Sequence, residues 1–553
     1  LSDSELDNIT TTGTLTIGQA TTKGSDGAGT SASTLTSGAI TLDELTLGSK
    51  KVALVSNSTI NDDDDTSTSL TTSGTLTLTS SGNIGDSGGS QGLDLDVGTL
   101  IITGTGSGNV IVTEASTLVL GATTVGGTFS GTATTGDITD SGALAITGAA
   151  TFITGATGSN IVLDGSTNAF AAAVTMTADD GTEAFGNITF VDSAAVDLDS
   201  SASANGDLFI NAGTDGAISG NLSITATTGN ITQNIALTIG GTSSFTTSAS
   251  NATITLSTDS NALTGAVSAS TTGGTGDVAI DNGTTALILG TVSTGRNFEA
   301  RSGNGITDTG VITVAGTGTF ISDVDDKDIV LDSDNAITGA LTFTTQGSSN
   351  LSDVTFDNGS TAISLAAFTT EGDLTLKTDA AIALTGHTVN GDLSVTSAGA
   401  ISQSAALTVT GTSSFTSTGS NNNITLSTDS NDLRGVVSAS TVGSSGDITI
   451  DNGTTALILG TVTANGALSI RGGNGITDNG VITVTGTSLF HSDVTAKAIT
   501  LDSNNAMAGA VSITHTGAAD VAIDNHTTAL ILGTVTTGRN FEARSGNGIT
   551  DTG

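Results

Sequence analysis

Residues 374–411 read LTLKTDAAIALTGHTVNGD and then LSVTSAGAISQSAALTVTG, two segments whose first Leu residues are 19 positions apart. Short runs within them alternate an apolar residue with Ser, Thr or Asp, as in LTLKT, LSVTS and ALTVTG. This alternation with period 2 is typical of a β-strand with one buried face. Gly, Asn and Asp separate the runs and favour turns. The pattern therefore predicts coils of about 19 residues that are built from short strands.

Longer repeats run through the sequence. IDNGTTALILGTV stands at 280–292 and unchanged at 450–462, IDNHTTALILGTV stands at 523–535, and GRNFEARSGNGITDTG stands at both 295–310 and 538–553. Repeats at a fixed period are the sequence signature of a solenoid. A GTxxF-like signature places Phe at 152, 245, 320, 415 and 490, and an Asn follows each one, at 168, 261, 335, 431 and 505.

The Phe positions define modules that alternate between about 75 and about 95 residues. The difference is one coil, so we expect four coils in a short module and five in a long one. GITDTG at 305–310 and the similar GITDNG at 475–480 are each followed by VITV, so the array is expected to continue beyond 553. The predicted organisation is degenerate β-helix coils at 1–151, long modules at 152–244 and 320–414, short modules at 245–319 and 415–489, and a truncated module at 490–553.

The composition supports strand ladders throughout. The 553 residues include 75 Gly but no Pro, Cys, Trp or Tyr. Pro lacks the N–H group that a central strand needs, and its absence fits a sequence of paired strands. We predict an all-β fold, a right-handed parallel β-helix of about 29 coils with 19–20 residues each. The alternative is a tandem array of immunoglobulin-like β-sandwiches, but the Cys pair and the tyrosine corner of that fold are missing.

The charge and the Cys count exclude several functions. A formal net charge of -41 repels nucleic acid and anionic membranes. Without Cys there is no disulfide, thiol chemistry or Cys-metal site. No apolar run approaches the ~20 residues of a membrane span. The start, LSDSELDNIT, has neither the basic nor the apolar region of a signal peptide.

Two motifs, GDLSVTSAGAISQSAALTVTGTSSF at 391–415 and DNGTTALILGTV at 451–462, carry a family resemblance. They resemble the β-strand repeats of large bacterial surface proteins, namely filamentous-haemagglutinin-like adhesins of two-partner secretion and related giant autotransporter-type proteins. The resemblance covers about 130–553 well and 1–130 loosely. It implies an extracellular or cell-surface β-helix that is exported by a bacterial-type route and has an adhesive or fibre-forming role.

The expected function is structural: a rod that forms or extends a surface filament, stalk or sheath by stacking coil on coil. Its partners would be further copies, joined end to end or laterally. The alternative is a receptor- or cell-binding adhesin with cell-surface or host receptors as partners. A polysaccharide-acting enzyme is disfavoured because basic residues are sparse and Phe is the sole aromatic residue. An ice-binding face would need ranks of Thr, as in TLTLT at 75–79, on many coils, but Ser, Asp, Asn and Gly interrupt them. No catalytic or cofactor-binding residue is predicted.

Acidic clusters are the candidate metal ligands. Hard cations such as Ca²⁺ bind several carboxylates, but a solvated loop also explains such a cluster and is the favoured interpretation. Asp281, Asp451 and Asp524 occupy equivalent corners, where an Asx turn is favoured over cation binding. The weak calcium candidates are Asp62, Asp63, Asp64, Asp65, Asp323, Asp325 and Asp326.

The His and Arg residues are predicted to lie on the surface. His387, His491, His515 and His526 share no metal-binding spacing. Glu299 and Glu542 lie between the Arg residues of the repeated RNFEAR motif, which predicts local ion pairs of little energy. The Arg residues are Arg296, Arg301, Arg539 and Arg544.

Overall fold

A computed structural model of the protein has two compact units, Leu1–Gly283 and Thr284–Gly553. Its described part contains 63 β-strands and one short helix, α1 (Asp3–Leu6). None of the helices found there is long and apolar enough to cross a membrane. The structure describes residues 3–6, 8–18, 38–63, 67–85, 92–104, 106–178, 186–199, 206–211, 217–346 and 352–552.

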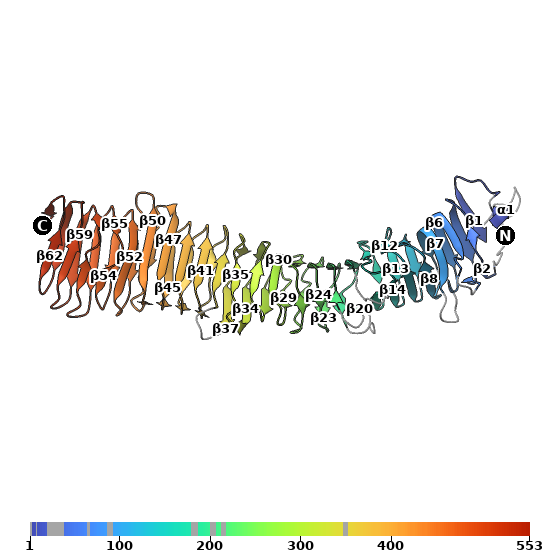
Figure 1. The fold of residues 1–553 in the computed structure, drawn as a ribbon, viewed down its shortest axis with the longest axis horizontal. Coiled ribbons are helices and arrows are strands. Elements are labelled where there is room, and N and C mark those ends of the chain that lie inside the picture. The colour runs from blue at the N-terminus through green and yellow to red at the C-terminus, as the bar shows by residue number, and fades with distance from the viewer. Residues whose placement is uncertain are drawn as a thin grey trace. The chain divides into compact units, whose positions relative to one another are not determined.

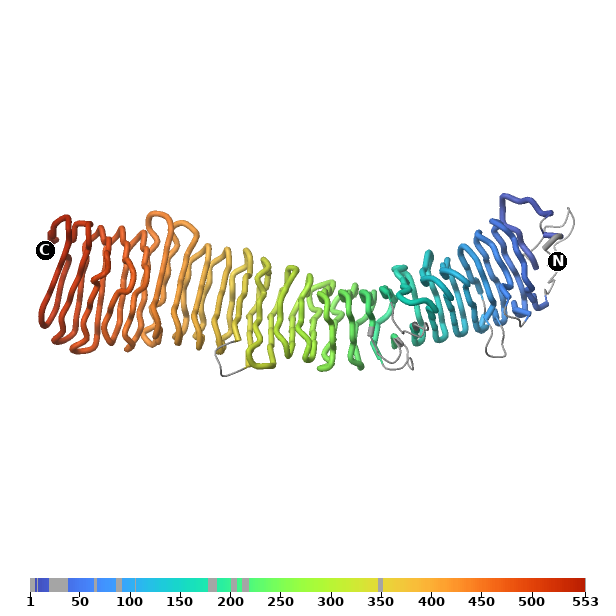
Figure 2. The backbone as a smooth tube through the Cα atoms, viewed as in Figure 1, coloured from blue at the N-terminus to red at the C-terminus, as the bar shows by residue number. Residues whose placement is uncertain are grey.

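A coil passes through up to three short strands. One coil of the first unit contains β14 (Ala150–Thr154), β15 (Ile161–Leu163) and β16 (Ala169–Phe170). The next coil places β17 (Val174–Ala178) beside β14 and β18 (Ile188–Asp192) beside β15, both in parallel. The backbone groups of one coil therefore bond to the neighbouring coils, and Figure 2 shows the backbone of each unit winding in this way.

Strands at the same place in successive coils form long parallel stacks (Figure 1). The first unit has two such stacks. One comprises β8 (Val110–Glu114), β11 (Phe129–Ala133), β14, β17 and β20 (Asp207–Asn211). The other comprises β9 (Leu118–Leu120), β12 (Ile138–Asp140), β15, β18, β22 (Leu222–Ala226), β25 (Ser243–Thr247) and β28 (Val267–Thr271). The second unit also has two such stacks. One comprises β35 (Ile329–Leu331), β38 (Val354–Asp357), β41 (Leu374–Thr378), β44 (Leu393–Ser397), β47 (Ser413–Ser420) and β50 (Val436–Val442). The other comprises β48 (Ile424–Leu426), β51 (Ile448–Asp451), β53 (Leu468–Arg471), β56 (Ser488–Ser492), β59 (Ala510–His515), β61 (Leu530–Thr536) and β63 (Ile549–Asp551).

These stacks confirm the predicted all-β fold, a parallel β-helix, and exclude the antiparallel immunoglobulin sandwich. The uniform coil of about 19 residues is wrong for much of the sequence. Leu374 does pair with Leu393, as predicted, but Ile188 pairs with Leu222, 34 positions further on. Longer coils explain why the protein makes about 22 turns instead of about 29.

The module is not a whole number of coils. In the first unit Phe245 belongs to a column that runs through Ile224 and Phe190 to Leu163. Leu163 lies on β15, the strand that follows Phe152 in its own coil. The second Phe of the pair therefore stands three coils and one strand after the first, on the next face of the solenoid.

The second unit follows the same rule twice. Phe415 heads a column through Val395, Leu376 and Phe356 to Leu331, which lies on the strand after that of Phe320. Phe490 likewise heads a column through Ile470 and Ile450 to Leu426, on the strand after that of Phe415. The module at 320–414 thus has four coils and one further strand, where five coils were predicted. The module at 415–489 has three coils and one further strand, where four coils were predicted.

Signature Phe side chains fill the interior beside small residues. Phe320 stacks on Phe343 with ring centroids 5.6 Å apart. A Cβ atom added to Gly318 would lie 3.2 Å from the Phe320 ring and 3.1 Å from Leu341, so the small residue makes room for the ring. The residue two positions before each signature Phe is small and buried in all five cases, namely Ala150, Ser243, Gly318, Ser413 and Ser488.

Buried Asn residues hold the corners between strands. Asn452 accepts the backbone N–H of Leu433 at Oδ1 (2.7 Å) and donates from Nδ2 to the carbonyl oxygens of Leu433 (3.0 Å) and Ala456 (2.9 Å). Buried backbone groups need partners, so the amide replaces ladder bonds that the corner lacks. Eight further Asn residues, each at most 2% exposed, accept a backbone N–H from the preceding coil in the same way: Asn168, Asn261, Asn282, Asn335, Asn358, Asn431, Asn505 and Asn525.

Candidate functional site

The first predicted calcium cluster is only partly described. Asp62 is 4% exposed, and its Oδ1 accepts hydrogen bonds from the Ser69 hydroxyl (2.7 Å) and from the Asp63 backbone N–H (2.9 Å). Its Oδ2 has no hydrogen-bond partner among the described residues. Asp63 is exposed, and Asp64 and Asp65 lie outside the described residues.

The second predicted calcium cluster does not converge on one point. Asp323 forms an ion pair with Arg301 across neighbouring coils, with 2.6 Å between Oδ2 and Nε. Asp325 and Asp326 are exposed, and Asp326 has a left-handed backbone with φ of 60°. In the part of the sequence that the structure describes, neither predicted cluster brings three carboxylates within reach of one ion. Calcium binding by these residues stays a prediction.

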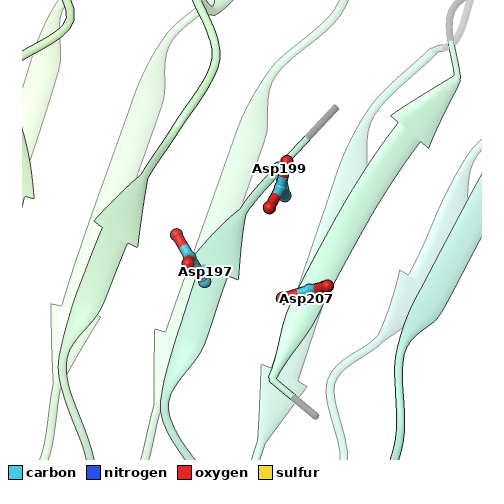
Figure 3. A group of neighbouring side chains, drawn as sticks. All are labelled: Asp197, Asp199 and Asp207. Carbon is cyan, nitrogen blue, oxygen red and sulfur yellow. The ribbon is translucent and has the colours of Figure 1, made fainter. Parts of the chain in front are cut away.

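A different group of three carboxylates does converge. Oxygens of Asp197, Asp199 and Asp207 lie within 4.8 Å of one another, as Figure 3 shows. The register of the parallel strands β19 (Val196–Leu198) and β20 brings Asp197 beside Asp207. The spacing of the three Asp residues alone gives no sign of this pairing, because it depends on which strands are neighbours.

The carboxylates of this group already have protein partners. Asp197 accepts hydrogen bonds from the Thr232 hydroxyl (2.9 Å) and from Nδ2 of Asn234 (3.1 Å), and the same Nδ2 also reaches Asp199 (3.3 Å). Oxygen atoms of this kind suit a hard divalent cation. The hydrogen bonds from the next coil equally serve to reduce repulsion among the three charges.

The IDN corners form Asx turns, as predicted. Oδ1 of Asp451 accepts the backbone N–H of Gly453 at 2.9 Å, and Oδ1 of Asp281 and Asp524 accept the N–H two residues on in the same way. Asp357, which the repeated IDN motif does not mark, forms the same turn with the N–H of Gly359. These oxygens are therefore occupied by the backbone of their own corner.

At two of these corners, those of Asp357 and Asp451, the other carboxylate oxygen contacts a basic residue of the next coil. Oδ2 of Asp357 lies 2.5 Å from Nζ of Lys377, and Oδ2 of Asp451 lies 2.9 Å from a guanidinium nitrogen of Arg471. Arg471 also binds Asp493 (2.6 Å), which in turn contacts Nε2 of His491 (2.5 Å). Lys377 and Arg471 thus neutralise two of the corner carboxylates.

The predicted ion pairs within RNFEAR are confirmed in one copy of the motif. Arg544 contacts Glu542 at 2.6 Å, and both side chains are more than half exposed. In the other copy Arg301 pairs with Asp323 from the following coil. The partner differs because 295–310 has a coil stacked on it, whose strand β34 (Gly318–Asp325) faces the β31 strand (Phe298–Ser302).

The prediction that all four His residues lie on the surface is wrong for two of them. His387 is 2% exposed, and its ring lies 4.9 Å from that of Phe368. Burial lowers the pKa of His387 to about 4, so the ring is neutral at physiological pH. His515 is 4% exposed and contacts the carbonyl oxygen of Lys497 (2.6 Å). His491 is partly exposed, and His526 is exposed.

A column of Asp residues lines one corner of the second unit. The backbone N–H of Asp353 donates to Oδ1 of Asp328 (2.9 Å), that of Asp373 to Asp353 (2.7 Å) and that of Asp392 to Asp373 (2.7 Å). Burial, together with the neighbouring charges of Asp373 and Asp328, raises the pKa of Asp353. Like charges on adjacent strands destabilise a sheet, so repulsion within this column of carboxylates lowers the stability of the second unit.

One buried carboxylate titrates near neutrality. Glu114 is fully buried, and both its carboxylate oxygens lie 3.2 Å from the backbone nitrogen of Val97. Burial raises the pKa of Glu114 to about 7, although the N–H of Val97 opposes the shift. Burial also raises the pKa of Asp192 and of Asp308. Each of these three carboxyl groups lies at the end of a buried strand.

The cleft of the second unit beside β60 (Val521–Asp524) and β62 (Phe541–Arg544) has a volume of about 240 Å³. Asp502, Asp524, Glu542 and Arg544 line it, and Arg544 is already paired with Glu542. Ligand pockets usually measure ~300–1,000 Å³, so this cleft is small for an organic substrate.

Five segments of the protein match a family model described as repeats of unknown function (DUF5649). Together they cover about two thirds of the sequence. Neither a curated protein nor a solved structure matches the sequence. The matched segments are residues 107–177, 185–270, 275–344, 371–440 and 445–514.

Proposed function

The chain belongs to the family of repeats of unknown function (DUF5649), and we propose that it serves as a structural rod segment in a filament, stalk or sheath at the cell surface. The observation that carries the proposal is the continuous stacking of coils within each unit. The extracellular location and a bacterial-type export route are part of the proposal and come from the resemblance of the repeats to surface proteins.

Coil stacking gives a rod its strength without any dedicated site. In the second unit the column of Leu331, Phe356, Leu376, Val395 and Phe415 is at most 1% exposed throughout. Each coil contributes its own buried side chains and its own backbone bonds to two neighbours. The stability of such an array is a sum of coil terms and nearest-neighbour terms, so length can grow without a new fold.

The repeated motif shows what end-to-end assembly would bury. Phe298 and Ile306 belong to GRNFEARSGNGITDTG at 295–310 and are at most 1% exposed. Phe541 and Ile549 belong to the identical sequence at 538–553 and are 37% and 45% exposed. A further coil over β62 and β63, from more residues of the same array or from a second copy, would cover these apolar side chains and the open strand edge.

The test is electron microscopy of the purified protein over a range of concentrations, together with immunogold labelling of native cells. We expect filaments that grow end to end, and labelled filaments or sheaths at the cell surface. In a protein of residues 1–553, Phe541→Asp should shorten the filaments, because it places a charge on the coil edge that is exposed there. Leu489→Asp is the matched control, since Leu489 is 41% exposed on a strand face away from that edge.

Monomers at all concentrations and label confined to the cell interior would overturn the proposal. Specific binding of the monomer to host or neighbouring cells, without filaments, would favour the alternative function as an adhesin.

A further inference from the structure

Asn–Gly pairs are the points of a polypeptide that are most prone to deamidation of Asn. Gly has no side chain to hinder its backbone nitrogen from approaching the carbonyl group of the Asn side chain. Ten such pairs occur in the sequence. One of them, at 205–206, is not fully described. The other nine divide into two classes by their hydrogen bonds.

In the first class the Asn side-chain amide and the backbone N–H of the following Gly are both hydrogen-bonded. At 452–453 the Asn452 amide makes its three corner hydrogen bonds, and the N–H of Gly453 donates to Asp451. At 390–391 Nδ2 of Asn390 donates to Glu371 (3.0 Å), and the N–H of Gly391 donates to a carbonyl oxygen of the previous coil (3.1 Å). This protected class comprises Asn282, Asn358, Asn390, Asn452 and Asn465.

In the second class neither the Asn side-chain amide nor the N–H of the following Gly makes a hydrogen bond within the described residues. The Asn474 side chain is exposed and has no hydrogen bond within the described part of the protein, and the same holds for the N–H of Gly475. Gly475 has φ of 101°, a conformation that side chains disfavour, so the corner keeps a Gly at this position. This open class comprises Asn304, Asn474, Asn479 and Asn547.

We infer that the four open Asn–Gly corners deamidate spontaneously in the folded protein, while the five protected ones do not. The Gly nitrogen attacks the carbonyl carbon of the Asn side chain, and a new carbon–nitrogen bond closes a cyclic imide. The bond between that carbon and the Asn amide nitrogen breaks, and ammonia leaves with the proton lost by the Gly nitrogen. Water then opens the imide to aspartate or isoaspartate.

The product changes the corner in two ways. Each conversion adds one negative charge. Isoaspartate also inserts a methylene group into the backbone at a point that pairs with the preceding coil, since the carbonyl oxygens of Gly305, Gly475 and Gly548 accept the N–H groups of Leu287, Leu457 and Leu530, each at 3.0 Å. Modification would therefore accumulate with age at these contacts between coils.

The test is to incubate the full-length folded protein at mildly alkaline pH and to follow each Asn–Gly peptide by mass spectrometry. We expect the mass gain of deamidation, with isoaspartate, at Asn304, Asn474, Asn479 and Asn547 and none at the protected Asn residues. Asn474→Gln should remove the gain at residue 474 alone, with Asn479 of the same peptide still reacting, because a Gln side chain would have to close a larger ring.

The control is the same incubation in denaturant, where all ten pairs should react at similar rates. That result would show that the protection is structural and does not come from local sequence. Equal rates for the two classes in the folded protein, or an unmodified open class, would overturn the inference. Both outcomes are independent of the proposed function.

Discussion

At the scale of single residues, the interior corners of the solenoid depend on amide and carboxyl groups whose hydrogen bonds reach the neighbouring coil. The sequence period marks the positions of Asn168, Asn261, Asn335, Asn431 and Asn505. It does not reveal that these residues are buried, because Asn is a turn residue on the surface in most proteins. His387 was predicted to lie on the surface for the same reason, because its sequence context does not reveal that it is buried.

Asn452→Ala should destabilise the second unit strongly. The change leaves the N–H of Leu433 and two carbonyl oxygens without their partner, and each buried unsatisfied group costs about 1–3 kcal/mol. Asn474→Ala is the matched control and should change the stability by less than about 0.5 kcal/mol, because Asn474 is exposed. Denaturant titration followed by circular dichroism measures both. Similar losses for the two variants would contradict the role given to the buried amide.

Glu114→Gln should stabilise the first unit at neutral and higher pH. Below about pH 4.5 Glu114 is protonated in the folded and the unfolded protein. As the pH rises towards 7, the unfolded protein gains free energy by ionising while folded Glu114, with its pKa of about 7, stays protonated. Stability present at low pH is therefore lost over this range, by up to about 3 kcal/mol.

Melting temperatures between pH 4 and pH 8 would test this prediction, with Glu299→Gln as an exposed control. The wild-type protein and the control should both lose stability over that range, and Glu114→Gln should lose less. A parallel decline in all three proteins would contradict the assignment of the pH dependence to Glu114.

At the scale of strands and coils, the sequence predicts more of the structure. Period-2 runs locate the strands, and the 19-residue spacing of Leu374 and Leu393 locates a coil. Coil lengths elsewhere could not be predicted, because loops between strands vary from coil to coil and the pairing partner of a strand depends on them. The three-carboxylate group of Asp197, Asp199 and Asp207 was missed for the same reason.

Ser413 tests the small position before a signature Phe. Its hydroxyl is buried and has no hydrogen-bond partner among the described residues, so Ser413→Ala should be neutral or stabilise by about 1 kcal/mol. Ser413→Leu should destabilise by about 1–3 kcal/mol or more, because the added atoms overpack the core beside Phe415. Thermal unfolding of both variants measures the difference. A tolerated Leu would refute the pairing of a small residue with the Phe ring.

Removal of one whole coil should leave a folded protein. Deletion of residues 374–392 joins Asp373 to Leu393, which occupies the same register position as Leu374. Strands on every face then find equivalent partners, so sheet content per residue and protease resistance should be retained. Deletion of 374–383 is the control, because it shifts later strands to the wrong face and should expose the core. Equal protease sensitivity of the two deletions would contradict coil-wise modularity.

At the scale of the whole molecule, the net charge of -41 opposes the compact state, and columns such as Asp328, Asp353, Asp373 and Asp392 concentrate the repulsion. Salt should therefore raise the melting temperature. Between about 0.01 M and about 1 M salt the Debye length falls from about 30 Å to about 3 Å, which screens these charges.

The double variant Asp353→Asn with Asp373→Asn should show a smaller rise with salt. Asn fits such a column, since Asn160 and Asn187 of the first unit accept the N–H of the next coil in the same way. NaCl and CaCl₂ are to be compared at equal ionic strength. A larger rise with CaCl₂ would show specific calcium binding by the acidic groups in place of screening.

The extra strand in each module gives the array a direction as well as a length. Because Phe245 stands one face on from Phe152, and Phe415 and Phe490 each stand one face on from the Phe before them, copying a module lengthens the solenoid and also moves the equivalent residues of the next module to the next face. Gain or loss of one module by gene duplication therefore re-aims whatever the array carries, and the number of modules sets where it points.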